Sequence, residues 1–220
     1  MVDEYLSEHE QAEQLRQWLR ENWLWLVTGV VLGLSIVFGY RWWNAHQAAR
    51  SQEAGQQFSA LLDALGRNQR EEGLQIAGKI TGEYTDTPYA DQTQLVLARL
   101  DIESGELDKA AAALRQVMDS TRDPDLALVA RLRLARVQLA KGSYDDALAT
   151  LEAVDNAAVA ARVAELRGDV MVARGKPAEA LLAYRQAQSA TEEGKGADGL
   201  VDQELLRLKI DELSATTAAE

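Results

Sequence analysis

Residue types that commonly carry catalysis or bind metal ions are scarce in this chain. It has no cysteine and only two histidines, His9 and His46, in 220 residues. These histidines flank a long uncharged stretch and there are no thiolates, so the usual zinc-binding sets cannot be built. Neighbouring carboxylates such as Asp145 and Asp146 point in different directions on a helix, as on a solvated face. The glycines around Lys195 lack the strand that a phosphate-binding loop requires. We expect no enzyme, no metal and no cofactor.

The composition favours a helical binding protein. The formal net charge is −12, which argues against nucleic-acid binding and for a soluble, self-repelling surface. Only 3 prolines and 2 phenylalanines occur, while alanine, leucine, glutamate, glutamine and arginine dominate. These residues favour helices, and the β-branched and aromatic runs of strands are few. The fold class expected is therefore all-α.

One long apolar segment predicts a membrane anchor. Residues 22–40 carry no charged side chain. A helix of that length spans about 28 Å, close to the hydrocarbon thickness of a bilayer. Tryptophan prefers the two membrane interfaces, and every tryptophan of the chain lies near one end of this segment. They are Trp18, Trp23, Trp25, Trp42 and Trp43. We expect a transmembrane helix at 22–43.

Two other interpretations of this segment fit less well, and its direction stays open. A buried helix of a soluble protein has no reason to sort tryptophan to both ends. A cleaved signal peptide needs a positive leader and a shorter apolar run, but residues 1–21 hold six acidic and two basic side chains. Arg16 and Arg20 precede the span and Arg41 and Arg50 follow it, so the count of flanking positive charges is a tie.

The region after the anchor contains an internal repeat. Gly105 and Gly142 lie 37 residues apart, and Gly175 follows 33 residues later. Each glycine comes where a helix must stop, because glycine adopts the left-handed conformation that commonly ends a helix at little cost. Around each glycine the same pattern of large, small and helix-starting residues recurs. It comprises Leu97-Ala98, Leu134-Ala135 and Arg167-Gly168, then Asp108, Asp145 and Pro177, then Ala110, Ala147 and Ala180, then Leu114, Leu151 and Tyr184.

This spacing resembles the tetratricopeptide repeat, a helical hairpin of about 34 residues. In that family certain first-helix residues line a concave face. The resemblance implies a mixed apolar and charged groove able to bind a peptide, with the following candidate residues: Leu95, Arg99, Ile102, Leu132, Arg136, Leu139, Arg162 and Asp169. The alternative is that the leucines pack between repeats, or lie under the helix that follows the anchor.

Less regular segments flank the three repeats. A fourth, degenerate repeat is expected before the other three in the chain, with Gly73, Ala77 and Ile80 in its second helix and a first helix around residues 58–65. A last helix near residues 200–213 should cap the stack. The expected organisation is a tail at 1–21, the membrane helix at 22–43, a juxtamembrane helix or linker at 44–65, a repeat domain at 66–213 and a disordered tail at 214–220.

The chain as a whole resembles the YfgM family. The resemblance is carried by the acidic N-terminal tail, the run Trp-Leu-Trp-Leu-Val-Thr-Gly at 23–29, the exit Gly-Tyr-Arg-Trp-Trp at 39–43 and the degenerate repeats. It implies a bacterial inner-membrane protein with a cytoplasmic N-terminus and a periplasmic domain. The implied partners are the Sec translocon, a membrane-anchored chaperone of the PpiD type and newly translocated client chains.

Three functional hypotheses follow. The first is a non-catalytic adaptor beside the translocon. The second is a dimerising scaffold whose spans pair through Gly29 and Gly33, a small-xxx-small pattern that lets helices approach closely. The third is regulation of envelope-stress signalling through residues 1–21.

Overall fold

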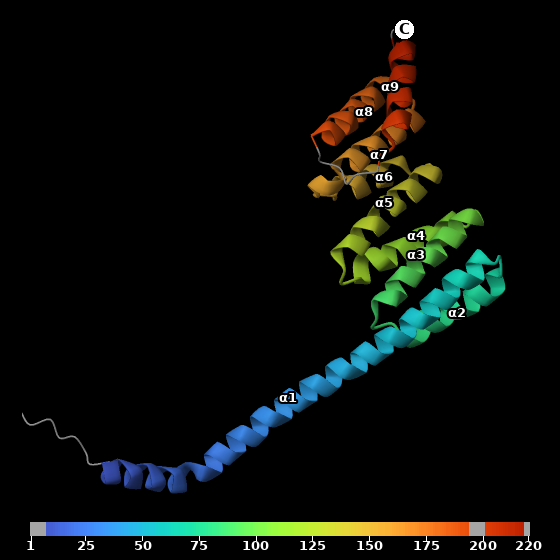
Figure 1. Ribbon diagram of the computed structural model, residues 1–220. Coiled ribbons are helices and arrows are strands. Elements are labelled where there is room, and N and C mark those ends of the chain that lie inside the picture. Colours follow the sequence, from blue (N-terminus) through green and yellow to red (C-terminus); the bar gives the residue numbers. More distant parts are fainter. Residues whose placement is uncertain (1–7, 194–200, 218–220) are drawn as a thin grey trace, which may run out of the picture. The chain divides into compact units, whose positions relative to one another are not determined.

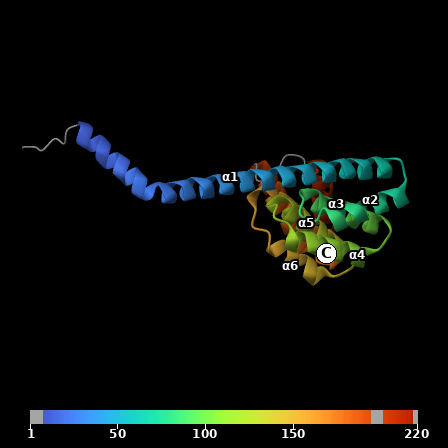
Figure 2. The same cartoon turned by 90° about the horizontal axis from the view of Figure 1, so that it is seen from below.

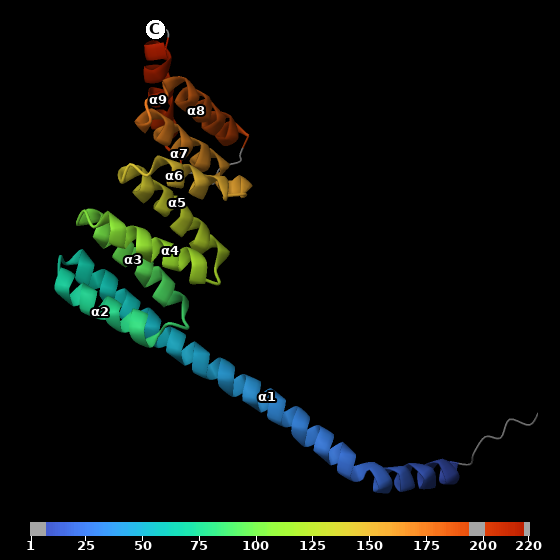
Figure 3. The same cartoon turned by 180° about the vertical axis from the view of Figure 1, so that it is seen from behind.

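The computed structural model describes residues 8–193 and 201–217, and all regular structure within them is helical. Figures 1 and 3 show the helices from α2 onward stacked in chain order, with α9 beside α8 at the C-terminal end. The helices are α1 (Glu8–Gly66), α2 (Arg70–Glu83), α3 (Pro88–Glu103), α4 (Leu107–Ser120), α5 (Pro124–Ala140), α6 (Tyr144–Glu152), the 3-10 turn η1 (Ala157–Val159), α7 (Ala160–Ala173), α8 (Pro177–Glu192) and α9 (Gln203–Thr217). The expected all-α fold with a repeat domain is confirmed.

The chain divides into two compact units, Met1–Gln52 and Glu53–Glu220. Helix α1 belongs to both, since it runs without interruption through the expected membrane span and the expected juxtamembrane segment 44–65. The compact repeat unit therefore begins at Glu53, inside α1, rather than at residue 66. The final segment of α1 is the first helix of the stack, which explains why no break separates linker from domain.

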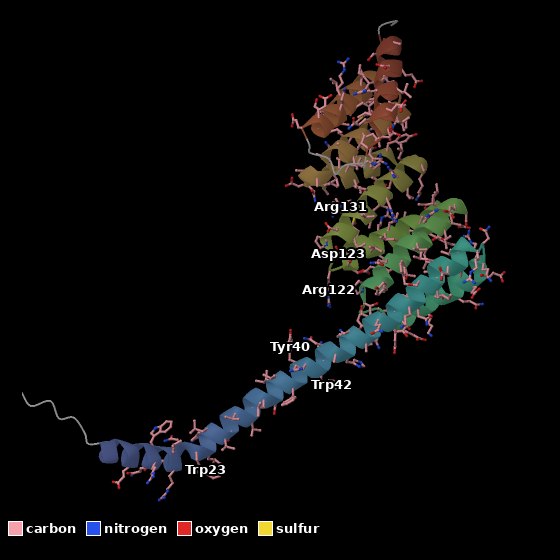
Figure 4. All side chains as sticks on the ribbon, viewed as in Figure 1. Trp23, Tyr40, Trp42, Arg122, Asp123 and Arg131 are labelled. Carbon is pink, nitrogen blue, oxygen red and sulfur yellow. The ribbon has the colours of Figure 1, made fainter. Side chains whose placement is uncertain are left out.

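Within the first unit, α1 has the properties of a membrane span. It is the one helix among the described residues that is long and apolar enough to cross a bilayer. Trp23 lies near one end of the apolar run and Tyr40 and Trp42 near the other (Figure 4). The hydroxyls of Thr28 and Ser35 donate to the carbonyl oxygens four residues earlier, at 2.7 and 2.8 Å. The helix itself thus satisfies the polar side chains that a bilayer would leave without water.

In the second unit the described helices form four antiparallel hairpins, and the same type of turn joins the two helices of each hairpin. Gly105, Gly142 and Gly175 have φ angles of 76°, 75° and 69°. At Gly105 the amide donates to Ile102 O at 3.0 Å, and the next amide, of Glu106, donates to Asp101 O at 2.8 Å. This pair of bonds satisfies carbonyls that the helix end leaves free. The predicted helix ends are confirmed.

The structure contains the expected fourth, degenerate repeat, and asparagine replaces glycine in the turn between its two helices. Asn68 has a φ of 59°, and it lies 37 residues before Gly105. The amide of Asn68 donates to Leu65 O and that of Gln69 to Ala64 O, as in the other turns. Asparagine tolerates the left-handed conformation better than most residues, so the turn geometry survives without glycine.

Small residues lie where the two helices of a hairpin cross, and large ones fill the space beside them. The buried positions that recur are Ala110, Ala147 and Ala180, followed by Leu114, Leu151 and Tyr184. Figure 2 looks along the stack, so the helices of successive hairpins overlap in projection. Each hairpin buries its apolar residues partly against the next, which is why the core is a series of linked clusters.

Helix α9 caps the stack, but its apolar residues divide between two faces. Leu206 is 2% exposed and packs with α7 and α8, whereas Leu205 and Leu208 are 47% and 60% exposed. The expected capping helix therefore buries only some of its leucines against the stack. The helix also extends to Thr217, past the boundary expected at 213, because no glycine or proline ends it there. Residues 218–220 of the expected tail lie outside the described residues.

Candidate protein-binding site

The structure separates the predicted groove residues into buried and exposed sets. Leu95 is 7% exposed and belongs to the core formed by α3, α4 and α5. Leu132 is half-buried and packs against a cluster that includes Leu151 and Leu166. These leucines pack between repeats, which is the alternative raised from the sequence, and Leu95 has too little exposed surface to anchor a partner.

Three predicted residues do come together around one cavity. Arg99 and Ile102 of α3 and Arg136 of α5 line a cavity of about 380 Å³ that α3, α4 and α5 form. Its remaining walls are Ala98, Leu107, Leu114, Arg133, Val137 and Ala140. Ile102 is 41% exposed, so its side chain is accessible at the rim. We call this cavity the arginine pocket.

A second cavity repeats the arginine pocket one hairpin earlier. Seven of the nine residues that line the arginine pocket have counterparts 37 positions earlier in a cavity of about 450 Å³, lined by α1, α2 and α3. Arg99 borders both. In the earlier cavity, Val96 takes the place of Arg133. The chemistry of the two cavities therefore differs in charge while the backbone framework is the same.

The last predicted residues, Arg162 and Asp169, are part of a chain of paired charges. Glu165 is 4% exposed and accepts from Arg162 and from Lys209 Nζ of α9, the latter at 3.1 Å. Lys209 Nζ also lies 2.7 Å from Asp169 Oδ1, which accepts from the Tyr184 hydroxyl at 2.7 Å as well. Asp169 thus pairs with Lys209 of the capping helix and Arg162 pairs with Glu165, so both predicted groove charges already have partners within the chain.

This network perturbs two ionisable groups. Burial, the hydrogen bond to Asp169 and the nearby negative charges raise the pKa of Tyr184. Burial opposes the charge on Lys209, but the hydrogen bonds and charges of Asp169 and Glu165 outweigh it and raise the pKa of Lys209. At neutral pH Lys209 is therefore a cation and Tyr184 a neutral hydrogen-bond donor. A cavity of about 300 Å³ lies beside them.

Sequence reasoning missed Arg133 and Lys209. Arg133 lies three residues before Arg136, at a position that is not among the first-helix residues that the repeat resemblance places on the concave face. Arg133 and Arg136 lie one helical turn apart on α5, and this spacing on one helix face is a signal that could have found Arg133. Lys209 gave no comparable signal, because its partners lie 40 and 44 residues away.

Other candidate positions stand apart from the pocket. A side chain added at Gly29 or Gly33 would meet nothing within 4 Å in this chain. The ring of His46 stacks on Trp42, with ring centroids 5.8 Å apart. No group of three or more metal-ligating side chains occurs in the parts of the chain that were described.

Comparison with known proteins extends over nearly the whole chain. The family described as "Tetratricopeptide repeat-like domain" matches residues 16–215. A protein of Escherichia coli strain K12 named "Ancillary SecYEG translocon subunit" is 33% identical over 211 residues, which cover 96% of this chain and 98% of that protein. Proteins of the same name in Haemophilus influenzae and Neisseria gonorrhoeae are 28% and 27% identical, over 94% and 95% of this chain and 98% of each relative.

No solved structure matches the chain. The family resemblance seen in the anchor and the repeats is confirmed by these relatives, whose matches include both parts. On this evidence the chain belongs to the YfgM family of ancillary SecYEG translocon subunits, with their tetratricopeptide repeat-like domain.

Proposed function

We propose that this protein is a membrane-anchored, non-catalytic adaptor of the Sec translocon. The observation that carries the proposal is the similarity, over 96% of the chain, to a protein named as an ancillary SecYEG translocon subunit. The candidate span in α1, followed by a stack of hairpins, suits an adaptor, because repeat stacks present extended surfaces to other proteins. The adaptor would serve newly translocated chains together with a PpiD-type chaperone.

The adaptor needs its repeat domain on the periplasmic side, with residues 1–21 in the cytoplasm of a bacterial inner membrane. Protease added to spheroplasts tests this orientation. We expect digestion of residues 44–220 from outside, while a cytoplasmic marker protein stays intact. Protection of the domain until the membrane is lysed would contradict the proposal.

Site-specific crosslinking tests the partners. Photoreactive residues at Ile102 and Arg136 report on the exposed groove residues, and one at Leu182 of α8, which is 62% exposed, serves as the control. We expect the first two positions to capture SecYEG, a PpiD-type chaperone or nascent chains. Crosslinks from Leu182 alone would place the partner surface elsewhere.

A structural role is the alternative. Gly29 and Gly33 are exposed in the apolar helix and touch nothing that requires glycine within one chain. Pairing of two spans would give both glycines a purpose. Changing both to leucine should then abolish self-association in detergent, whereas the adaptor predicts no change. Control of envelope-stress signalling through residues 1–21 is separable, since deleting them would remove regulation and keep translocon association.

A further inference from the structure

We propose that the arginine pocket binds a peptide segment in which a carboxylate lies next to a bulky apolar side chain. This inference rests on the proposed adaptor function and specifies the chemistry of the partner segment. It joins two observations, an accessible apolar cavity and two guanidinium groups at its edge that have no partner among the residues that the structure describes.

The apolar half of the pocket is accessible. Ala98, Ile102, Leu107 and Ala140 supply aliphatic walls from three helices, and Ile102 is 41% exposed. A cavity of about 380 Å³ has room for a large side chain. Placing such a side chain there removes apolar surface from water on both partners, which favours binding.

The charged half comes from Arg133 and Arg136. Among the described residues, neither arginine has an ion pair or a hydrogen bond. They lie three positions apart on α5, where like charges on one helix face repel each other. A carboxylate between them would replace this repulsion with charge-assisted hydrogen bonds. The other basic residue of the pocket, Arg99, already pairs with Glu103 at 2.8 Å.

At the end of the stack, by contrast, the charge at the corresponding repeat position has a partner. Asp169 there occupies the repeat position of Arg136. Its charge is balanced by Lys209, which also reaches Glu165. In the cavity before the arginine pocket, Arg70 donates to the carbonyl oxygen of Leu100. Of these three cavities, the arginine pocket is the one that combines apolar walls with two guanidinium groups lacking a partner among the described residues.

A peptide fits this arrangement better than a lipid headgroup. The arginine pocket and the preceding cavity share Arg99 and follow each other with the spacing of the repeat. An elongated ligand can lie across both, with its backbone along the first helices of two hairpins. The overall acidity of the chain, −12, disfavours a general affinity for anionic surfaces, so attraction has to be local.

Fluorescence anisotropy with the full chain in detergent tests the proposal. The probe is a labelled peptide that alternates Asp with Leu and Phe, and its matched control carries Asn at each Asp. We expect the Asp peptide to bind about tenfold more tightly or better, and the difference to shrink at high salt.

Variants separate the two halves of the pocket. R133Q/R136Q should remove the preference for Asp, whereas R122Q/R185Q, with the same change in charge outside the pocket, should keep it. I102N should weaken both peptides, and the matched exposed change L182N should weaken neither. Circular dichroism of every variant confirms that the helices are retained.

Three outcomes would overturn the proposal. The first is equal binding of the two peptides, and the second is an equal effect of the two double variants on the preference for Asp. The third is binding to anionic phosphatidylglycerol vesicles that R133Q/R136Q abolishes, without any Asp-dependent binding of the peptide. Co-purification of SecYEG with R133Q/R136Q is measured in parallel. If SecYEG co-purifies with the chain but the peptide shows no Asp-dependent binding, this inference alone is wrong. If SecYEG does not co-purify with the unmodified chain, the proposed adaptor function is wrong.

Discussion

At the scale of single residues, the last hairpin shows how the repeat tolerates change. Tyr184 stands where the other hairpins have Leu114 and Leu151. A methyl group added at Gly168 would lie under 3.0 Å from the Tyr184 ring. The equivalent residues in the other first helices are Ala98 and Ala135. The larger aromatic side chain is thus accommodated by a smaller residue across the crossing, because buried helices pack to a fixed density.

The substitution Gly168→Ala should therefore destabilise the domain by about 1–3 kcal/mol through overpacking. Gly78→Ala is the matched control, since an added methyl there meets nothing within 4 Å. In the interior of α2 that change should stabilise by about 0.5–1 kcal/mol. Urea denaturation followed by circular dichroism measures both, and equal effects would show that the Tyr184 contact does not set the choice of glycine.

The charges under the capping helix make stability depend on pH at the alkaline end. Both Tyr184 and Lys209 have a raised pKa in the folded chain. The unfolded chain then releases these protons first, so stability is present below the ordinary pKa values of about 10 and falls as pH rises beyond them. Urea midpoints at about pH 8 and about pH 11 measure the loss. Tyr184→Phe should make the fall less steep, and an unchanged slope would assign it to other groups.

At the scale of elements, each helix boundary has its own chemical cause. The turns within hairpins depend on a left-handed residue, and this residue is Asn68 in the first hairpin and glycine in the next three. Between hairpins, α3 and α5 begin at Pro88 and Pro124. Asp123 Oδ1 accepts from the amides of Asp125 and Leu126 at 2.9 and 3.3 Å, which caps α5. The side chain of Asp123 is labelled in Figure 4.

Removal of this cap should have a measurable cost. Asp123→Ala leaves two amides at the start of α5 without their acceptor, and we expect a loss of about 0.5–2 kcal/mol. Asp123→Asn keeps an acceptor oxygen and should recover most of the stability. The midpoint of urea unfolding compares the two, and indistinguishable midpoints would mean that the cap contributes nothing.

At the scale of the whole repeat unit, contacts run from each hairpin to the next. Asp108 pairs with Lys141 of the following hairpin, and Asp145 pairs with Arg174 at 3.0 Å in the same way. The hydrogen bond and charge of Lys141 lower the pKa of Asp108. The carboxylates of both pairs are exposed and screened by solvent, so the pairs fix register more than they add stability. The cohesion of the stack comes from buried residues at each interface.

The capping helix should therefore control the stability of the last hairpin. Leu206→Ala removes a side chain that is 2% exposed, and we expect a cost of about 2–5 kcal/mol. Leu208→Ala changes a side chain that is 60% exposed and should have an effect within about 0.5 kcal/mol. Hydrogen exchange should show loss of protection in α7 and α8 before α3 and α4. Uniform loss throughout the stack would contradict nearest-neighbour coupling.

The sequence alone determined the class of the fold and the position of its turns. Uncharged length and the sorting of tryptophan predict the span, and a fixed period with Gly105, Gly142 and Gly175 predicts the hairpins. These features are local, because bilayer thickness and helix termination act on consecutive residues. The sequence signal for the first hairpin is weaker than for the others, since Asn68 replaces the glycine that marks their turns.

Tertiary structure decided which side chains are available to a partner. Repeat positions suggested eight groove residues, but Leu95 packs into the core, and Arg162 and Asp169 join the network completed by Lys209 of α9. Arg133 lines the pocket because α3, α4 and α5 pack together, which the sequence around Arg133 does not show. Burial and charge pairing depend on residues tens of positions apart, so a local pattern cannot specify them, whereas the packed hairpins do.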